Sequence, residues 1–473
     1  METKLNYKRT FLIGLAFLSI CSFWQMYDNI IPLILQNTYH LGETMTGAVM
    51  ALDNVLAIFL LPVFGALSDK VHTKLGRRMP FIVAGTILAV IFMMLLPMID
   101  NAEKARWNTG ESFSNQVIFL AVLFFTLVSM GLYRSPAVAL MPDVTPNHLR
   151  SRANAVINLM GAVGGVYALI MIKVLVGKGE TPDYLPLFAS IAAVMSIAVG
   201  ILVITIRENK LRKEVEKAEA ANAGTIEEKA MAEGVEAAGE IEAVGDTDTG
   251  EVRASDGKKQ TGKTEGTKGM PKEVKRSMYF MLASIFLWFT AYNAVTTAFS
   301  RYTKVVWKME GGSFANCLMV ATVAAIFSYI PIGSISAKIG RKKTIMGGVL
   351  LMAACYGAAI FAREYHPIVN VAFALIGVAW AAINVNSYPM IVAMSSGSDV
   401  GKFTGTYYTF SMAAQILTPV LSGFLLENVS YNTLFPYALF FSLMAFLTMT
   451  QVRHGDVKPQ KKESILENFD VDD

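Results

Sequence analysis

Residues 11–36 read FLIGLAFLSICSFWQMYDNIIPLILQ, an apolar run that carries a single formal charge, Asp28. About 20 apolar residues in a helix are enough to cross a hydrocarbon core of about 30 Å, so the run predicts a membrane-spanning helix. Similar runs follow at residues 44–67, 80–99, 116–142, 153–177, 185–206, 277–301, 314–337, 344–362, 368–394, 402–426 and 432–451. Together they predict an all-α membrane protein with 12 transmembrane helices in two pseudo-symmetric six-helix bundles.

The overall composition supports this class. Hydrophobic residues make up 53% of the 473 residues and charged residues 16%, with a mean hydropathy of +0.45. Soluble domains carry about 25% charged residues, so the deficit indicates a chain that lies in a lipid bilayer. The three cysteines, Cys21, Cys317 and Cys355, all fall within apolar runs. Their odd number and their dispersal argue against a disulfide framework and against a metal site.

The basic residues of the short loops predict the orientation. The loops after the second and the eighth span each carry four of them: Lys70, Lys74, Arg77 and Arg78, then Lys338, Arg341, Lys342 and Lys343. The loop after the first span carries none. Because Lys and Arg favour the cytoplasmic side, both termini are predicted to be cytoplasmic in a plasma-membrane protein. This role also explains the net charge of +4 without nucleic-acid binding.

Residues 207–275 form a segment of different composition between the two halves. They are rich in Ala, Glu, Gly, Lys and Thr, and such a segment buries too little apolar surface to fold. We therefore expect a mostly disordered cytoplasmic linker between a bundle at 1–206 and a bundle at 276–453, with a cytoplasmic tail at 454–473. Residues 257–264, GKKQTGKT, fit the phosphate-loop pattern, but neither a strand before them nor a helix after them is expected, so the match is read as chance.

The two halves repeat each other at two loops. Residues 65–70 read GALSDK and precede Gly76-Arg77-Arg78, while residues 333–338 read GSISAK and precede Gly340-Arg341-Lys342. The first loop resembles the signature of the major facilitator superfamily. Its continuation, KLGRRMPFI at residues 74–82, resembles sucrose–proton symporters, a group usually placed with the glycoside–pentoside–hexuronide–cation symporters. The resemblance implies two six-helix repeats that open in turn to the two sides of the membrane.

The fourth and fifth spans extend this resemblance. Residues 131–136, GLYRSP, are similar to the arginine-bearing fourth helix of the sucrose family, and residues 152–155, RANA, to the start of its fifth helix. Plant members typically read Arg-Ala-Leu-Leu-Ala-Asp after the arginine. This chain instead has Ser135-Pro136 and a later acid, Asp143. The departure leaves sucrose itself open as the substrate.

Three ionisable residues lie well inside the spans: Asp28, Asp53 and Arg134. Each costs roughly 2.5–3.5 kcal/mol at the bilayer centre, so such groups are expected to face a cavity or to pair with one another. The five histidines all lie in loops or at span ends, so a coupled proton would need a carboxylate. Our hypothesis is that Asp28 binds the proton and Arg134 pairs alternately with Asp28 and with substrate. Asp53 is the competing carrier, and a static salt bridge is the alternative for all three.

A sugar site should combine aromatic rings, which stack on CH faces, with amides and hydroxyls. Several spans place such residues on one helical face, at spacings of three or four, although polar and small residues also hold membrane helices together. The candidate substrate-binding residues are Trp24, Gln25, Asp28, Tyr133, Arg134, Asn158, Trp288, Tyr292, Asn293, Trp380, Asn384, Tyr408 and Gln415.

The loop after the second span suggests a gate by resemblance. Charge and helix-dipole contacts between the lobes would hold the outward-open state there. Its candidate residues are Asp69, Gly76, Arg77, Arg78, Asp143 and Arg152. For the arginines, membrane orientation alone is the alternative explanation.

The sequence thus predicts a monomeric secondary transporter, not an enzyme, which moves a disaccharide or glycoside with protons, or with sodium, and uses no other cofactor. One alternative is a carrier of another small solute, either an organic anion or an exported drug. An anion carrier should show several cavity cations, whereas only Arg134 is predicted here, and a drug exporter should have a more apolar cavity. A non-transporting sugar sensor is a further alternative.

Overall fold

The computed structural model describes residues 5–107, 115–146, 149–179, 181–217, 271–394 and 400–456. Within these ranges, twelve long helices account for the predicted spans: α1 Tyr7–Asn37, α2 Glu43–Lys70, α3 Met79–Trp107, α4 Gln116–Asp143, α5 Arg150–Leu175, α6 Leu185–Thr205, α8 Lys272–Val305, α9 Ala315–Ile339, α10 Arg341–Ala359, α11 Val369–Ala393, α12 Val400–Asn428 and α13 Leu434–Thr450. A short 3-10 helix, η2 (Tyr431–Thr433), precedes α13. The predicted all-α fold is therefore confirmed.

Eleven of the described helices are long and apolar enough to cross a membrane. The remaining long helix, α10, begins with three basic residues, Arg341, Lys342 and Lys343, which lower its hydropathy. The middle of the predicted linker and the phosphate-loop match at 257–264 lie outside the described residues. Of the linker, residues 208–217 are helical, and its last residues, from Lys272, already belong to α8.

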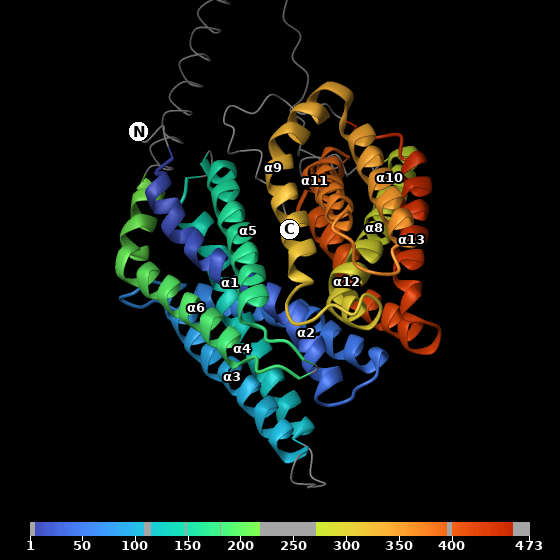
Figure 1. Ribbon diagram of the computed structural model, residues 1–473. Coiled ribbons are helices and arrows are strands. Elements are labelled where there is room, and N and C mark those ends of the chain that lie inside the picture. The colour runs from blue at the N-terminus through green and yellow to red at the C-terminus, as the bar shows by residue number, and fades with distance from the viewer. Residues whose placement is uncertain are drawn as a thin grey trace, which may run out of the picture.

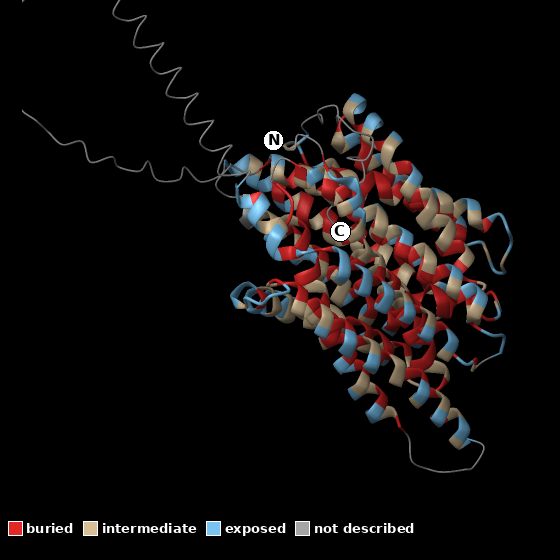
Figure 2. Cartoon of the chain, turned by 90° about the vertical axis from the view of Figure 1, so that its left-hand side faces the viewer, coloured by how far each residue is buried: buried red, intermediate tan, exposed pale blue. Residues whose placement is uncertain are grey.

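The helices form two lobes, α1 to α6 and α8 to α13, that stand side by side (Figure 1). We call the side on which α1 begins and α13 ends the terminal face, and the opposite side the distal face. Buried residues fill the interior of each lobe and the exposed ones lie mainly on outward helix faces (Figure 2). In a membrane protein those exposed apolar faces suit contact with lipid.

Close packing within a lobe depends on small residues. A Cβ atom at Gly164 of α5 would lie 2.0 Å from the backbone oxygen of Leu18 in α1. Ser22 uses this proximity to donate a hydrogen bond of 2.9 Å to the carbonyl oxygen of Gly164. Such small residues let membrane helices approach closely where there is no water to drive them together.

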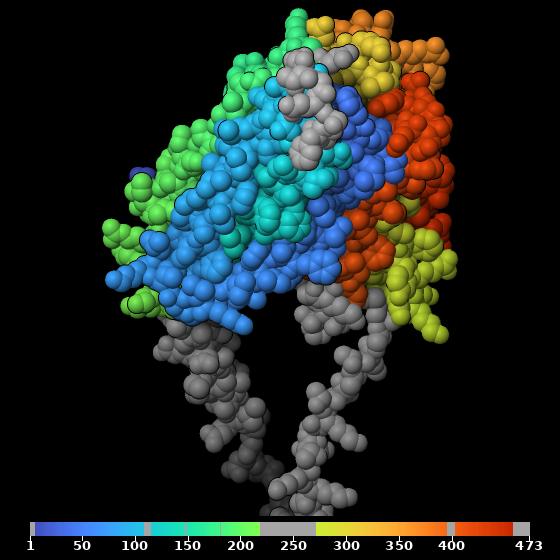
Figure 3. All heavy atoms as spheres, turned by 90° about the horizontal axis from the view of Figure 1, so that it is seen from below, coloured from blue at the N-terminus to red at the C-terminus, as the bar shows by residue number. Residues whose placement is uncertain are grey.

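The lobes meet along three helix pairs, α2 with α12, α5 with α9 and α1 with α8. The contacts between named atoms lie near the distal ends of these helices. Thr44 of α2 donates its backbone N–H to Glu427 of α12 at 2.8 Å, and a Cβ at Gly312 would lie 2.1 Å from the carbonyl oxygen of Ile172. In Figure 3, which views the distal face, blue N-terminal atoms lie directly against red C-terminal atoms. The molecule is therefore closed on its distal side.

Candidate functional site

The ionisable residues predicted inside the spans come together in the N-terminal lobe. Asp28, Asp53 and Arg134 lie on α1, α2 and α4, and each is half-buried. Asp53 interacts electrostatically with both Arg134 and Asp28. The guanidinium carbon of Arg134 also lies 5.8 Å from the centre of the Trp24 ring, within the range of a cation–π contact. We call these four residues the central cluster.

The arrangement differs in one respect from the pairing that the sequence suggests. Arg134 interacts with Asp53, and no ion pair between Arg134 and Asp28 is found among the described residues. Asn54 donates its side-chain amide to Asp53 at 2.8 Å, which fixes that carboxylate. Arg134 thus interacts with Asp53, and its alternate pairing with Asp28 is not seen among the described residues of this state.

A further polar group near the carboxylates was not identified from the sequence. Tyr27 is only 1% exposed, and its hydroxyl interacts electrostatically with Asp53 and Asp28. This hydroxyl has no hydrogen-bond partner among the described residues. A tyrosine next to an aspartate in an apolar run is the one local signal that could have identified it.

A cavity leads toward the central cluster from the terminal face. Its volume is about 340 Å³ and its lining includes Phe17 of α1, Val138 of α4 and Asn154 of α5. Val138 follows Arg134 by four residues and Phe17 precedes Trp24 by seven, so each pair shares a helix face. The cavity therefore lies one to two helical turns from the cluster, on the same faces of α1 and α4.

The C-terminal lobe contributes an aromatic platform. The rings of Tyr292 on α8 and Trp380 on α11 stack with centroids 3.8 Å apart and planes 7° apart. Phe289 meets Trp380 edge to face at 5.2 Å. Both stacked residues are half-buried. Trp288 precedes Asn293 by five residues as Trp24 precedes Asn29, and this alignment puts Tyr292 at the position of Asp28. A half-buried flat ring of this kind could stack on the CH face of a sugar.

The other predicted binding residues divide by burial. Gln25, Asn158, Asn293, Tyr408 and Gln415 are half-buried on α1, α5, α8 and α12. Trp288 and Tyr133 are fully buried, and Asn384 is 4% exposed. Tyr133 is hydrogen-bonded to Ser19 at 2.5 Å, inside the N-terminal lobe. These buried residues support the lobes from within, because no side chain that is packed on every side can also touch a solute.

Four of the predicted gate residues, Asp69, Arg77, Arg78 and Asp143, form one ionic network at the terminal face. Arg77 pairs with Asp143 at 2.6 Å, and Arg78 pairs with Asp143 at 2.9 Å and with Asp69 at 2.5 Å. Arg152 lies in the first turn of α5. The ion pairs join α2, the loop before α3, and α4, which all belong to the N-terminal lobe. In this distally closed state the network braces one lobe rather than joining the two.

Glu208, just after α6, anchors the same loop. Its carboxylate accepts backbone N–H groups of Arg77, Arg78 and Met79 at 2.8–3.1 Å, at the start of α3. Gly76, at φ +126°, leaves room for it, because a Cβ there would lie 2.1 Å from Glu208 Oε2. An acid at a helix N-terminus satisfies free N–H groups and opposes the positive end of the dipole.

The loop arginine remains charged within this network. Partial burial lowers the pKa of Arg77. The hydrogen bond to Asp143 and the negative charges of Asp143, Asp69 and Glu208 raise it, and together they outweigh burial, so the pKa of Arg77 is raised. Arg77 therefore stays charged over the physiological pH range.

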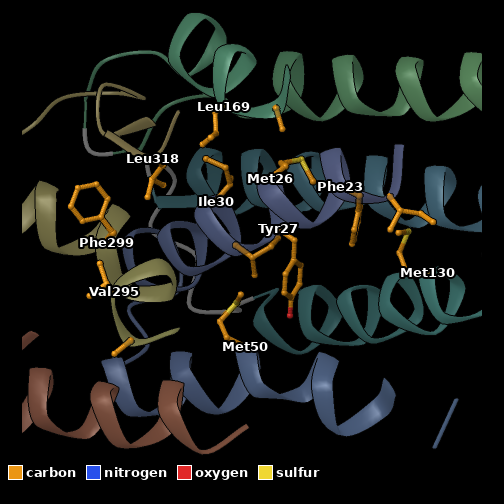
Figure 4. Close-up of a cluster of buried hydrophobic side chains, with 14 of the residues drawn as sticks. Phe23, Met26, Tyr27, Ile30, Met50, Met130, Leu169, Val295, Phe299 and Leu318 are labelled. Carbon is orange, nitrogen blue, oxygen red and sulfur yellow. The ribbon is translucent and has the colours of Figure 1, made fainter. Parts of the chain in front are cut away.

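A hydrophobic seal separates the central cluster from the distal face. Figure 4 shows part of it, in which Ile30 of α1 and Leu169 of α5 belong to one buried cluster with Phe299 of α8 and Leu318 of α9. These residues come from both lobes. Each of the four side chains is at most 8% exposed, so the contact between the lobes is closed to solute at this point.

A buried ion pair also joins the lobes at the distal face. Arg301 of α8 lies 2.8 Å from Glu43 at the start of α2, and the side chains are 2% and 4% exposed. Tyr431 of η2 donates its hydroxyl to the other carboxylate oxygen of Glu43. The sequence gives little sign of this pair, since both residues fall at span ends, where charges are ordinary.

Comparisons with known proteins agree with this architecture. Among solved structures, the inward-open xylose transporter XylE from E. coli aligns over 98% of both chains with a TM-score of 0.60 at 14% identity. A point mutant of the nucleoside transporter NupG aligns over 94% of this chain and 100% of that one with a TM-score of 0.63 at 12% identity. At these identities the likeness concerns the fold.

Curated relatives match only a part of the chain. The sucrose transport protein SUC4 of Arabidopsis thaliana is 35% identical over 116 residues, 23% of this chain and 22% of that protein. The sucrose transport protein SUT3 of Oryza sativa subsp. japonica is 26% identical over 137 residues, 27% of each chain. The matched stretch thus spans about a quarter of these relatives.

The family profile covers nearly the whole chain. The Major Facilitator Superfamily matches residues 13–328 and 308–468, which include both lobes, the central cluster and the terminal ionic network. With the two six-helix lobes already described, this chain belongs to the Major Facilitator Superfamily and is a multi-pass membrane transporter, not an enzyme.

Proposed function

We propose that the protein is a sugar–proton symporter of the plasma membrane that carries a disaccharide or glycoside by alternating access. The observation that carries this proposal is the central cluster: two carboxylates and one guanidinium held half-buried beside an indole, one to two helical turns from a cavity near the terminal face. Membrane proteins keep ionisable groups at this depth for substrate or ion pathways.

The charge of the cluster supports proton coupling. Asp28, Asp53 and Arg134 sum to one negative charge when all three are ionised. One bound proton makes the cluster neutral, which lowers the cost of exposing it to an apolar surrounding while the lobes move. Since Asp53 interacts with Arg134 and is fixed by Asn54, we assign the transported proton to Asp28. Sodium as the coupling ion would need further oxygen ligands around the same carboxylates.

The nature of the side chains supports a sugar substrate. The Tyr292–Trp380 platform offers a flat apolar surface, and half-buried Gln25 and Asn158 offer amide donors and acceptors. Arg134 is the one cation of the central cluster, so the site fits a neutral polar solute better than an anion. The curated relatives are named as sucrose transport proteins, which agrees in class.

Orientation follows from the loop charges. The terminal face carries Lys70, Lys74, Arg77 and Arg78, so we assign it to the cytoplasm. The distally closed arrangement then corresponds to a state open to the cytoplasm. A sugar would leave the cluster through the cavity beside Val138 and Asn154.

The test is uptake of labelled sugars by the purified protein in proteoliposomes. Sucrose, maltose and a phenyl glucoside are offered under an imposed proton gradient, an imposed sodium gradient, or neither. The proposal predicts accumulation of at least one sugar above its external concentration only with the proton gradient. Accumulation driven by the sodium gradient alone would show that sodium, not the proton, is the coupling ion. Failure of all three sugars to enter or exchange, with a protein that remains folded, would contradict the sugar assignment.

A further inference from the structure

The Glu43–Arg301 ion pair is the most deeply buried charged contact between the lobes in the described part of the chain. Glu43 belongs to the N-terminal lobe, whereas Arg301 and Tyr431 belong to the C-terminal lobe and approach its two carboxylate oxygens from different elements. One carboxylate therefore holds two separate segments of the opposite lobe. Neither the family signature loop nor the central cluster includes these residues.

Nearby charged contacts across the lobes are different in kind. Lys178 and Glu310 lie 3.5 Å apart, but their side chains are 86% and 65% exposed. Glu427 accepts two hydrogen bonds from Thr44 and is also exposed. Exposed pairs of this type contribute little, because water competes for both partners. The buried pair is the contact whose loss would matter for the closed state.

Because the pair is buried, its effect on the closed state depends on both partners being present. Moving both charges out of water offsets much of their attraction, so an intact buried pair adds little net stability. Removing one partner leaves the other charge buried without compensation, which strongly disfavours the closed arrangement. Opening of the distal mouth would return both groups to water. Such a pair permits closure only when both partners are present and allows release at low cost.

Near the pair, α2 and α12 approach each other closely. A Cβ at Gly47 would lie 2.1 Å from the carbonyl oxygen of Pro419, and one at Gly423 would lie 2.5 Å from the carbonyl oxygen of Glu43. At these two points the helices meet through backbone and small residues.

We propose that Glu43, Arg301 and Tyr431 form a distal latch, which closes the distal mouth when the pair is intact and sets how often that mouth opens. The latch is a second set of functional residues, separate from the central cluster. It depends on the proposed function only in that a transporter must open to both faces. Its test measures opening and needs no knowledge of the substrate.

The reporter is a cysteine at Leu318, which is 8% exposed and belongs to the apolar seal, on a helix that packs against α5 of the other lobe. Cys21 and Cys317 are replaced by serine. Cys355, 5% exposed inside the C-terminal lobe, is kept as an internal control for unfolding. A water-soluble maleimide is applied to the full-length protein in nanodiscs, and labelling of each cysteine is followed by peptide mass spectrometry.

The latch predicts that Glu43→Gln and Arg301→Gln each increase the labelling rate at Leu318→Cys by about tenfold or more, because each leaves an unpaired buried charge. The double variant, which removes both charges, should return toward the parent rate. Glu427→Gln is the matched control at the same face and should change the rate less than about twofold. Cys355 should remain unlabelled throughout.

Three results would overturn the proposal, two of them in the labelling rate of the reporter. One is an unchanged Leu318→Cys rate in both single variants. The other is a double variant as open as the single ones, since this would mean that the residues act independently. Labelling of Cys355 together with the reporter would assign the effect to unfolding, and would equally count against a latch. A protein that passes this test but moves no sugar would contradict the proposed function alone.

Discussion

Gly47→Ala tests how closely the lobes must approach on the distal face. The added methyl would lie 2.1 Å from the backbone oxygen and 2.6 Å from the backbone carbon of Pro419. Ordinary contact begins at 3.4 Å, so α2 and α12 must separate by about 1.3 Å, the difference between 3.4 Å and 2.1 Å. Backbone atoms cannot turn aside as a flexible side chain can. Overpacking of this kind costs about 1–3 kcal/mol, which applies only to the distally closed state.

The free-energy cost translates into a change of populations. A penalty of about 1–3 kcal/mol lowers the ratio of the closed population to the open population by roughly 5- to 150-fold. We expect faster maleimide labelling of Leu318→Cys by a factor in this range, with slower net transport because closure is required in each cycle. Gly405→Ala, on the same helix as Pro419 and with no atom within 4 Å of the added methyl, is the control. Equal labelling and transport in the Gly47→Ala variant and the parent would refute the close-approach reasoning.

Other contacts carry three further predictions. Glu208→Gln should weaken the cap of α3 by about 1–2 kcal/mol and lower the melting temperature by about 2–4 °C, as read by thermal unfolding in detergent; an unchanged midpoint would count against the cap. Trp380→Ala should weaken sugar binding by about tenfold in equilibrium titration, and Trp380→Phe should recover most of it, whereas equal affinities would remove the platform from the site. In thermal-stability cycles, Asp53→Asn and Arg134→Gln should couple by about 0.5–3 kcal/mol, while Asp28→Asn and Arg134→Gln should be additive; coupling only in the second pair would restore the alternate pairing.

The helices could be predicted from the sequence because they depend on local information, whereas the gate came from a resemblance that placed its contacts between the lobes. Long apolar runs define spans by their length alone. Asp69 and the arginines 77 and 78 lie in one loop and its flanks, so their meeting needs only the turn between α2 and α3. Asp143 joins them because α4 returns to the same face.

The remaining features depend on how distant helices rotate and dock. The sequence places Asp28, Asp53 and Arg134 inside spans of the first half, but residue spacing does not show how these helices rotate to bring Asp53 near Arg134. Glu208 reads as one more acid in a charged linker, and only the fold brings it to the start of α3. The Glu43–Arg301 pair is seen in one arrangement of the two lobes. A transporter adopts at least two such arrangements, and the sequence does not show which contacts belong to which arrangement.

The central claim is that Asp28 carries the proton that drives uptake. Its most direct test compares two assays of the Asp28→Asn variant in proteoliposomes: exchange of labelled for unlabelled sugar at equal concentrations, and accumulation driven by a proton gradient. Asp28→Glu, which keeps a carboxylate, is the matched control. The account predicts that Asp28→Asn exchanges sugar at a rate similar to the parent but accumulates none, while Asp28→Glu retains part of both activities. Proton-driven accumulation by Asp28→Asn at the level of the parent would contradict it.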